Sequence, residues 1–238
     1  MPAPVFQALG SVAQGTGSIA PNWPAHQADD IALLVNESDG GANLSTPSGF
    51  ALVGRSTAIG SGTNQTQCDV WWCRATSSSM VAPVVGDAGD HNIGYIVTAR
   101  GCITTGNPWN IFSTGQATTS TATSAPGNTT TLSNTLTFYC VTGGGLNNAG
   151  VSVFGSGGPF NSNLPDLTLD LDFGSAVNNN GGASSLVHGT LSGIGDTGTV
   201  TGTSSGNDVK GWVVISLISP SSSSVVNTGN FFMFMNRI

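Results

Sequence analysis

The stretch that decides the fold is Leu164-Pro165-Asp166-Leu167-Thr168-Leu169-Asp170-Leu171-Asp172-Phe173, in which apolar and polar residues alternate. Successive side chains of a β-strand point to opposite faces of the sheet. The apolar members of the stretch are therefore predicted to share one face: Leu167, Leu169, Leu171 and Phe173. The polar members are predicted to share the other: Asp166, Thr168, Asp170 and Asp172. Such alternation is typical of a half-buried antiparallel strand with a wet outer face.

Short apolar runs recur along the rest of the chain, separated by Gly, Ser, Asn and Pro, and helical periodicity is almost absent. Further strands are predicted at 31–35, 50–53, 70–73, 93–97, 135–141, 151–154, 184–191, 198–203, 211–218 and 231–235. Residues 113–131, rich in Ser and Thr, are predicted to form a long surface connection. About ten short strands with long Gly/Ser/Thr/Asn loops predict an all-β, antiparallel β-sandwich of jelly-roll type.

The length of the chain fits one β-sandwich domain spanning 1–238. A division into two small β domains, 1–143 and 146–238, is the alternative, because Gly143-Gly144-Gly145 could separate them. The adjacent residues Trp71 and Trp72 point to opposite faces of their strand, which predicts a sheet covered on both sides.

Charged residues are rare: they make up 7% of the chain, against 38% hydrophobic residues, and the net charge is −7. Nucleic acid is therefore not an expected partner, since phosphate binding needs clustered Lys and Arg and the chain has a single Lys, Lys210. No segment approaches the roughly 20 apolar residues of a membrane-spanning helix, so membrane insertion is not expected.

Two motifs match catalytic or cofactor-binding patterns in their letters alone. Residues 202–206 (GTSSG) match the G-x-S-x-G nucleophile elbow, but no helix is predicted to follow and every His precedes the Ser. Residues 193–198 (GIGDTG) match a dinucleotide fingerprint without the helix that would hold the pyrophosphate, and a tight turn between strands is the interpretation that fits. No catalytic residue and no cofactor is predicted, and the chain is not expected to be an enzyme.

Metal binding has one weak candidate set, the carboxylates of Asp166, Asp170 and Asp172 on a common strand face. The spacing does not spell the oxygen-rich loop of a calcium site, and a solvated strand face is the simpler interpretation. The three His residues are not at ligand spacing and are expected to be hydrogen-bonded turn or core residues. Four cysteines match no zinc pattern: Cys68, Cys73, Cys102 and Cys140. Buried thiols are expected, with a disulfide formed after release from the cell as the alternative.

Several short motifs resemble those of another group of proteins. The chain carries DDIALL at 29–34, PSGF at 47–50, WCRAT at 72–76 and ARG at 99–101, with a Gly/Thr-rich turn before the strand of Trp212. This order resembles β-sandwich modules of tailed-bacteriophage virion proteins and of some bacterial surface proteins. Asp29 stands where that group has Gly, and Phe50 where it has Trp. The turn and strand-end positions of the likeness are Asp30, Gly49, Phe50, Arg74, Arg100 and Gly101.

The resemblance implies a structural role in a virion, in the capsid, neck, tail or fibre, with no catalytic residues to carry over. Gly49 and Gly101 are expected to permit tight turns, and Arg74 and Arg100 to bond turn carbonyls or pair with the Asp-rich loops. The expected partners are other copies of the chain, for example in a trimer, and other virion proteins. Because residues 1–4 (MPAP) begin no secretion signal, synthesis in the host cytoplasm is expected.

The apolar segment 231–235 is predicted to be buried in a sheet or at a subunit contact through Phe231, Phe232 and Phe234. A host-glycan adhesin is the alternative function, with aromatic and amide groups on loops such as 104–112. Trp23, Trp109 or Trp212 could be stacking platforms, although core packing is the expected role of Trp212, which is flanked by Val213 and Val214. A polysaccharide depolymerase is a more remote alternative, since Glu37 is the single Glu and no acid–base pair is evident.

Overall fold

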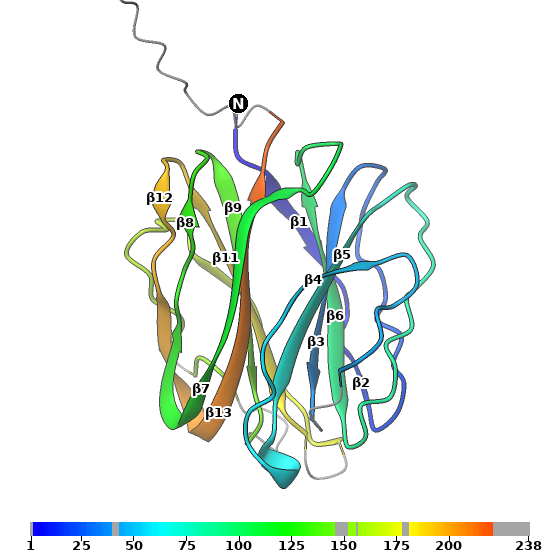
Figure 1. The fold of residues 1–238 in the computed structure, drawn as a ribbon, viewed down its shortest axis with the longest axis vertical. Coiled ribbons are helices and arrows are strands. Elements are labelled where there is room, and N and C mark those ends of the chain that lie inside the picture. Colours follow the sequence, from blue (N-terminus) through cyan, green and yellow to red (C-terminus); the bar gives the residue numbers. More distant parts are fainter. Residues whose placement is uncertain (1, 40–42, 146–151, 156, 178–180, 221–238) are drawn as a thin grey trace, which may run out of the picture.

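The computed structural model describes residues 2–39, 43–145, 152–155, 157–177 and 181–220 (Figure 1). The first half of the chain forms β1 (Val5–Leu9), β2 (Ala13–Gly15), β3 (Ile31–Ser38), β4 (Ala51–Arg55), β5 (Gln67–Arg74) and β6 (Asn92–Arg100). The second half forms β7 (Trp109–Ala125), β8 (Thr129–Thr130), β9 (Thr135–Gly143), β10 (Thr168–Gly174), β11 (Ala183–Leu191), β12 (Gly195–Asp196) and β13 (Val200–Ile218). The described residues include a 3₁₀ turn at Gly62–Asn64 and contain no α-helix.

The strands form two antiparallel sheets, so the predicted β-sandwich is confirmed. One sheet has the order β1-β6-β3-β5-β4, with β2 also pairing with β6, and the other has the order β10-β11-β9-β13-β7. Figure 1 shows the first sheet, coloured blue to blue-green, facing the second, coloured green to orange. Each half of the chain thus supplies one layer, while β8 and β12 form a small separate pair.

The largest core cluster lies between the layers and draws on both of them. Leu33, Val35 and Val97 come from the first sheet, and Phe138 and Ile215 from the second; all are at most 1% exposed. Burial of such side chains contributes about 1.5–3 kcal/mol each. The shared core fixes the positions of the strand ends, at which the candidate sites lie.

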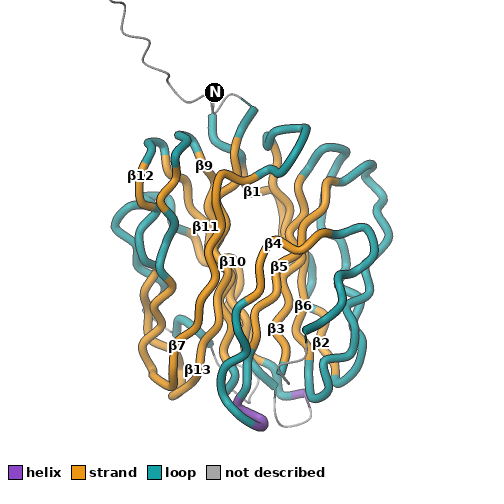
Figure 2. Tube along the Cα trace, in the orientation of Figure 1, coloured by secondary structure: helices purple, strands orange, loops and turns teal. Residues whose placement is uncertain are grey.

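The outer faces of both sheets are also covered. Trp71 packs in an outer cluster with Leu34 and Ile96, under side chains such as Val85 from the loops that run over the first sheet (Figure 2). Trp72 instead packs toward the central core. The prediction that the adjacent Trp side chains face opposite, covered sides is confirmed.

The prediction for residues 113–131 is wrong, because most of them belong to a strand. β7 runs for 17 residues and pairs along its length with β13. Its Ser/Thr/Ala sequence lacks apolar alternation, since much of the strand is exposed and is held by its backbone ladder rather than by core contacts. β13 is in turn a single strand of 19 residues that joins the two predicted at 198–203 and 211–218.

The stretch 164–173 is a strand only from Thr168, and its apolar residues do not share one face. The register of β10 against β11 shifts between Leu169 and Leu171, which marks a β-bulge. As a result Leu169 packs against a second cluster, which includes Tyr139 and Val187 of the second sheet, whereas Leu171 packs against the central core. One extra residue reverses the alternation, and the sequence does not signal it.

A strand predicted at 151–154 is not present in its described part, residues 152–154. The carboxylate of Asp172 accepts hydrogen bonds from the backbone N–H groups of Val153 (2.7 Å) and Phe154 (3.2 Å), in place of a strand ladder. The predicted contact residues Phe231, Phe232 and Phe234 lie outside the described residues. No helix in the described parts of the chain has the length and apolar character to span a membrane.

Candidate functional sites

One end of β3 holds a charge-balanced pair between two of the predicted residues. Arg100 donates from Nε to Asp30 Oδ1 (2.8 Å) and from Nη2 to Asp30 Oδ2 (2.7 Å), while the Gln27 N–H donates to the same carboxylate (2.9 Å). Asp30 is 1% exposed. The pairing expected for Arg100 with the Asp-rich turn is present, and it ties the start of β3 to the end of β6.

The other predicted turn residues behave largely as expected. Gly49 and Gly101 have φ angles of 81° and 79°, which favour glycine, and the Phe50 N–H closes the first turn on the Pro47 carbonyl (3.1 Å). Arg74 does not follow the prediction, since its terminal nitrogens are buried without a hydrogen-bond partner in the described structure. These positions lie at turns and strand ends of the first half of the chain.

The three carboxylates of the predicted metal candidate bond to separate parts of the second sheet. Asp166 accepts from the Thr190 N–H (2.7 Å), Asp170 pairs with His188 Nδ1 (2.7 Å), and Asp172 accepts from the loop at 153–154 and from Ser185. Their role as ligands stays a prediction. Among the described residues, the Asp and His side chains that gather closely enough to hold an ion are a different group.

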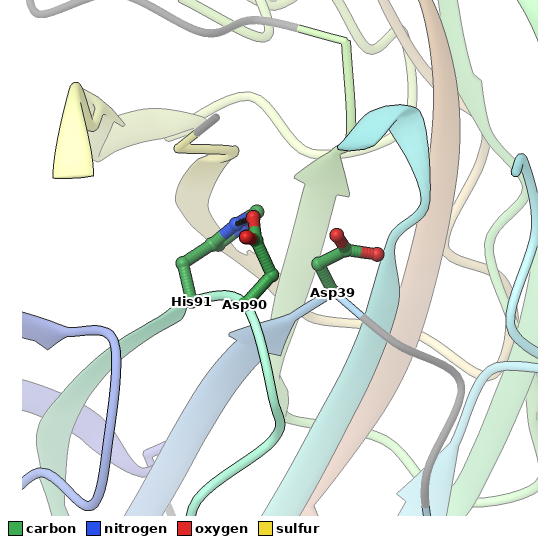
Figure 3. Close-up of side chains that lie close together, drawn as sticks. All are labelled: Asp39, Asp90 and His91. Atoms are coloured by element: carbon green, nitrogen blue, oxygen red, sulfur yellow. Dashed lines mark hydrogen bonds and ion pairs between the residues drawn. The ribbon is translucent and has the colours of Figure 1, made fainter. Parts of the chain in front are cut away.

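That group lies at the far end of β3, where Asp39, Asp90 and His91 come together (Figure 3). Their candidate ligand atoms all lie within 4.8 Å of one another. His91 Nδ1 is 3.1 Å from Asp90 Oδ2, and Nε2 is 3.1 Å from Oε2 of the neighbouring Glu37. The side chains of His91 and Glu37 are fully buried, and that of Asp90 is 25% exposed.

The strand ladder explains why residues distant in sequence meet here. β3 and β6 are antiparallel, and Ser38 pairs with Asn92 at the end of the ladder. Asp39 follows Ser38 directly, and His91 precedes Asn92. Both residues therefore lie at the same end of the β3–β6 ladder. Asn92 Nδ2 also donates to the carbonyls of Gly17 (3.1 Å) and Gly86 (3.0 Å), which holds the neighbouring loops against this end.

The buried pair of His91 and Glu37 binds its proton tightly. Burial alone would lower the pKa of His91, but Glu37, Asp90 and Asp39 raise it to about 9. Burial raises the pKa of Glu37, and the interactions with His91 and Thr66 offset part of that rise. The two shifts have different causes: the neighbouring carboxylates raise the pKa of His91, whereas removal from water raises the pKa of Glu37.

A second candidate site is an open surface cavity of about 580 Å³ over the first sheet. It is lined by Asn22, Trp23, Pro24, Ala25, His26, Ser78, Ser79, Met80 and Ala82. The rings of Trp23 and His26 lie 4.6 Å apart at 42°, and Trp23 Nε1 donates to the Val81 carbonyl (3.0 Å). An aromatic wall with amide and hydroxyl groups nearby suits a carbohydrate.

The third candidate is the outer edge of β7, which ends its sheet. Trp109–Ala125 contains no charged residue and no Pro, the features that usually protect an edge strand. Near its start, Trp109 packs edge-on to Trp72 (5.3 Å) and to Phe112 (6.4 Å), so Trp109 serves packing more than it offers the stacking platform considered from sequence.

Comparison with protein-family models, with curated proteins and with solved structures finds no match. Function is therefore inferred from the residues of this chain. The β7 edge offers backbone pairing to another chain, and the Trp23 cavity offers an aromatic surface to a small ligand. Sequence reasoning missed the group around His91, because its members are joined only by the end of the β3–β6 ladder.

Proposed function

We propose that the chain is a non-enzymatic structural protein of a tailed-bacteriophage virion, which acts through contacts with copies of itself and with other virion proteins. The observation that carries the proposal is the edge of β7, a strand of 17 residues without charge or Pro. A soluble protein that works alone usually blocks such an edge with Lys, Pro or a covering loop. Pairing with a neighbouring subunit would protect it instead.

Two further features support this proposal. The motif order around Asp30, Gly49 and Arg100 resembles phage β-sandwich modules, and Asp30 and Arg100 form the ion pair that closes one end of the sandwich. The low charge of the chain suits a surface that is covered in an assembly. We propose that the protein belongs to the capsid, neck, tail or fibre of the particle.

The test is to place charge on the β7 edge and measure self-association. Gln116 and Thr118 are exposed on β7, so the double variant Gln116→Lys/Thr118→Lys adds the residue type that blocks edge pairing. We expect self-association of the wild-type chain, measured by sedimentation velocity, to weaken at least tenfold in this variant. The chain should also be found in many copies by mass spectrometry of purified virions.

The matched control is Thr203→Lys, an exposed Thr on β13, whose neighbour in the ladder is β7 itself. This variant adds one Lys without touching the free edge and should associate like the wild type. A wild-type chain that stays monomeric at all concentrations, or equal association in the edge variant, would contradict the role of β7. Absence from virions would contradict the assignment to a particle.

A second candidate function, host-glycan binding, is favoured by the cavity around Trp23. The cavity lies at residues 22–26 and 78–82, away from the loop 104–112 considered from sequence. Trp23→Ala should abolish binding on a glycan array, while Phe160→Ala, which removes an aromatic side chain 66% exposed elsewhere, should not. Binding that survives Trp23→Ala would place any glycan site outside this cavity.

A further inference from the structure

We propose that Asp39, Asp90 and His91 form a binding site for one divalent transition-metal cation, of the class of Zn²⁺ or Mn²⁺, with Glu37 orienting the imidazole. The site lies within a single chain, so it is independent of the proposed subunit contacts. The geometry that points to it is the convergence of two carboxylates and one imidazole within 4.8 Å at the end of the β3–β6 ladder.

The charge of the cluster favours a cation. Three carboxylates, those of Glu37, Asp39 and Asp90, surround one imidazole, whose two nitrogens each face a carboxylate at 3.1 Å. Three basic residues of the described part of the chain pair with other carboxylates: Arg55 with Asp69, Arg100 with Asp30, and Lys210 with Asp208. A divalent ion bound here would be attracted by all three carboxylates.

A second observation concerns Glu37 itself. Its side chain is fully buried, and Oε1 accepts from the Thr66 hydroxyl (2.9 Å). Oε2 forms an ion pair with His91 Nε2 at 3.1 Å. Metal-binding His residues commonly direct the second ring nitrogen at a carboxylate, which fixes the tautomer. Glu37 fits that role. Nδ1 of His91, which faces Asp90, would then be the nitrogen that binds the metal.

The donor set indicates the class of metal. Imidazole suits zinc, iron, copper and nickel, whereas carboxylates suit harder ions, and a mixed set suits Zn²⁺ or Mn²⁺ better than Ca²⁺, which takes oxygen ligands. Ligands about 2.1 Å from one ion lie roughly 3–4 Å apart. The 4.8 Å limit observed here closes by a small rotation of the carboxylates, and Asp90, at 25% exposure, has room to turn.

The test is a titration of the full chain, stripped with a chelator, with Zn²⁺ and separately with Mn²⁺. Calorimetry should give one site per chain, and the melting temperature should rise with metal concentration because the ion binds the folded state. In NMR spectra, Zn²⁺ should shift the ring nitrogens of His91 and leave those of His188, which pairs with Asp170 alone, unchanged.

Two variants in the segment before β6 distinguish loss of metal binding from loss of folding. Asp90→Asn removes a proposed ligand and should weaken Mn²⁺ and Zn²⁺ binding at least tenfold. Asp87→Asn changes a nearby carboxylate, whose Oδ1 accepts from the Gly89 N–H (2.8 Å), and should bind like the wild type. Circular dichroism would show that both variants fold. No saturable binding, equal affinity in Asp90→Asn, or a site selective for Ca²⁺ or Mg²⁺ would overturn the proposal.

Discussion

The two ends of β3 both hold buried carboxylates, but they compensate the charge in different ways. At the start of the strand, Asp30 meets both arms of one guanidinium, that of Arg100, and the charges balance. At the far end, Glu37 and Asp39 share a single imidazole with Asp90. The first end is a closed ion pair, and the second is the site that we propose for a divalent cation.

The difference shows which buried charges serve structure alone. A bidentate Arg–carboxylate pair satisfies its donors and acceptors internally and stabilises one arrangement of the chain. A cluster with more carboxylates than cations is costly unless it binds a proton or a metal ion. β3 therefore has a structural ion pair before its first residue, at Asp30, and a candidate binding site after its last residue, at Asp39.

The largest effect is expected from Asp30→Asn at the balanced end. The amide keeps the shape of the carboxylate but turns one acceptor into a donor, which then faces donors from Arg100 or Gln27. Loss of charge-assisted hydrogen bonds at a buried group predicts a fall of about 3 kcal/mol in the free energy of unfolding. Urea denaturation at pH 7 measures it.

The control for that substitution is Asp29→Asn in the same turn, where the neighbouring carboxylate is exposed. Its φ of 70° suits Asn as well as Asp, so the stability should change little. If Asp30→Asn were as stable as this control, the Arg100 pair would not stabilise the strand end, and the contrast between the two ends would fail.

The balanced end could be predicted from sequence, because both residues belong to recognisable turn and strand-end motifs. Arg100 ends an apolar run, and Asp30 precedes another, which places both at strand ends. The cluster at the far end could not be predicted this way. His91 and Asp39 are neighbours only because β3 and β6 pair in the register that sets Ser38 against Asn92. The sequence of one strand alone does not determine this register.

The fold shows the same division between local and distant causes. Short apolar runs predicted the strands of the core, such as β3 and β9, because burial requires apolar side chains there. β7 was missed because its Ser/Thr-rich strand is held by pairing with β13, a distant segment. The bulge of β10 after Leu169 reversed the predicted faces, since one extra residue changes orientation without changing composition.

An intermediate effect, on the pH dependence of the free energy of unfolding, is expected from Asp69 on β5, the strand next to β3. Burial raises its pKa from 3.8 to about 6, although Arg55 opposes the shift. The folded state thus holds a proton that the unfolded chain releases at lower pH. The stabilisation is complete below about pH 4 and is lost as the pH rises through 6, by roughly 2–3 kcal/mol at about 1.36 kcal/mol per pKa unit.

Unfolding measured from pH 4 to pH 7 would test this, with Asp69→Asn as the variant that cannot titrate. The variant should keep the Arg55 contact through its amide oxygen and lose most of the pH dependence in this range. A pH profile identical to that of the wild type would show that another group is responsible.

The smallest effect is expected from Glu37→Gln at the unbalanced end, the counterpart of Asp30→Asn. The amide oxygen can still accept from Thr66, and His91 keeps Asp90 and Asp39 as neighbours, so no buried cation loses its last partner. Removal of one of several like charges offsets the lost contact, and we expect a change below about 1 kcal/mol in the free energy of unfolding without metal. Urea denaturation of Glu37→Gln and of Asp30→Asn under the same conditions measures the difference between the two losses. A loss as large as that of Asp30→Asn would mean that Glu37 and His91 form a closed pair, and that the two ends of β3 are alike.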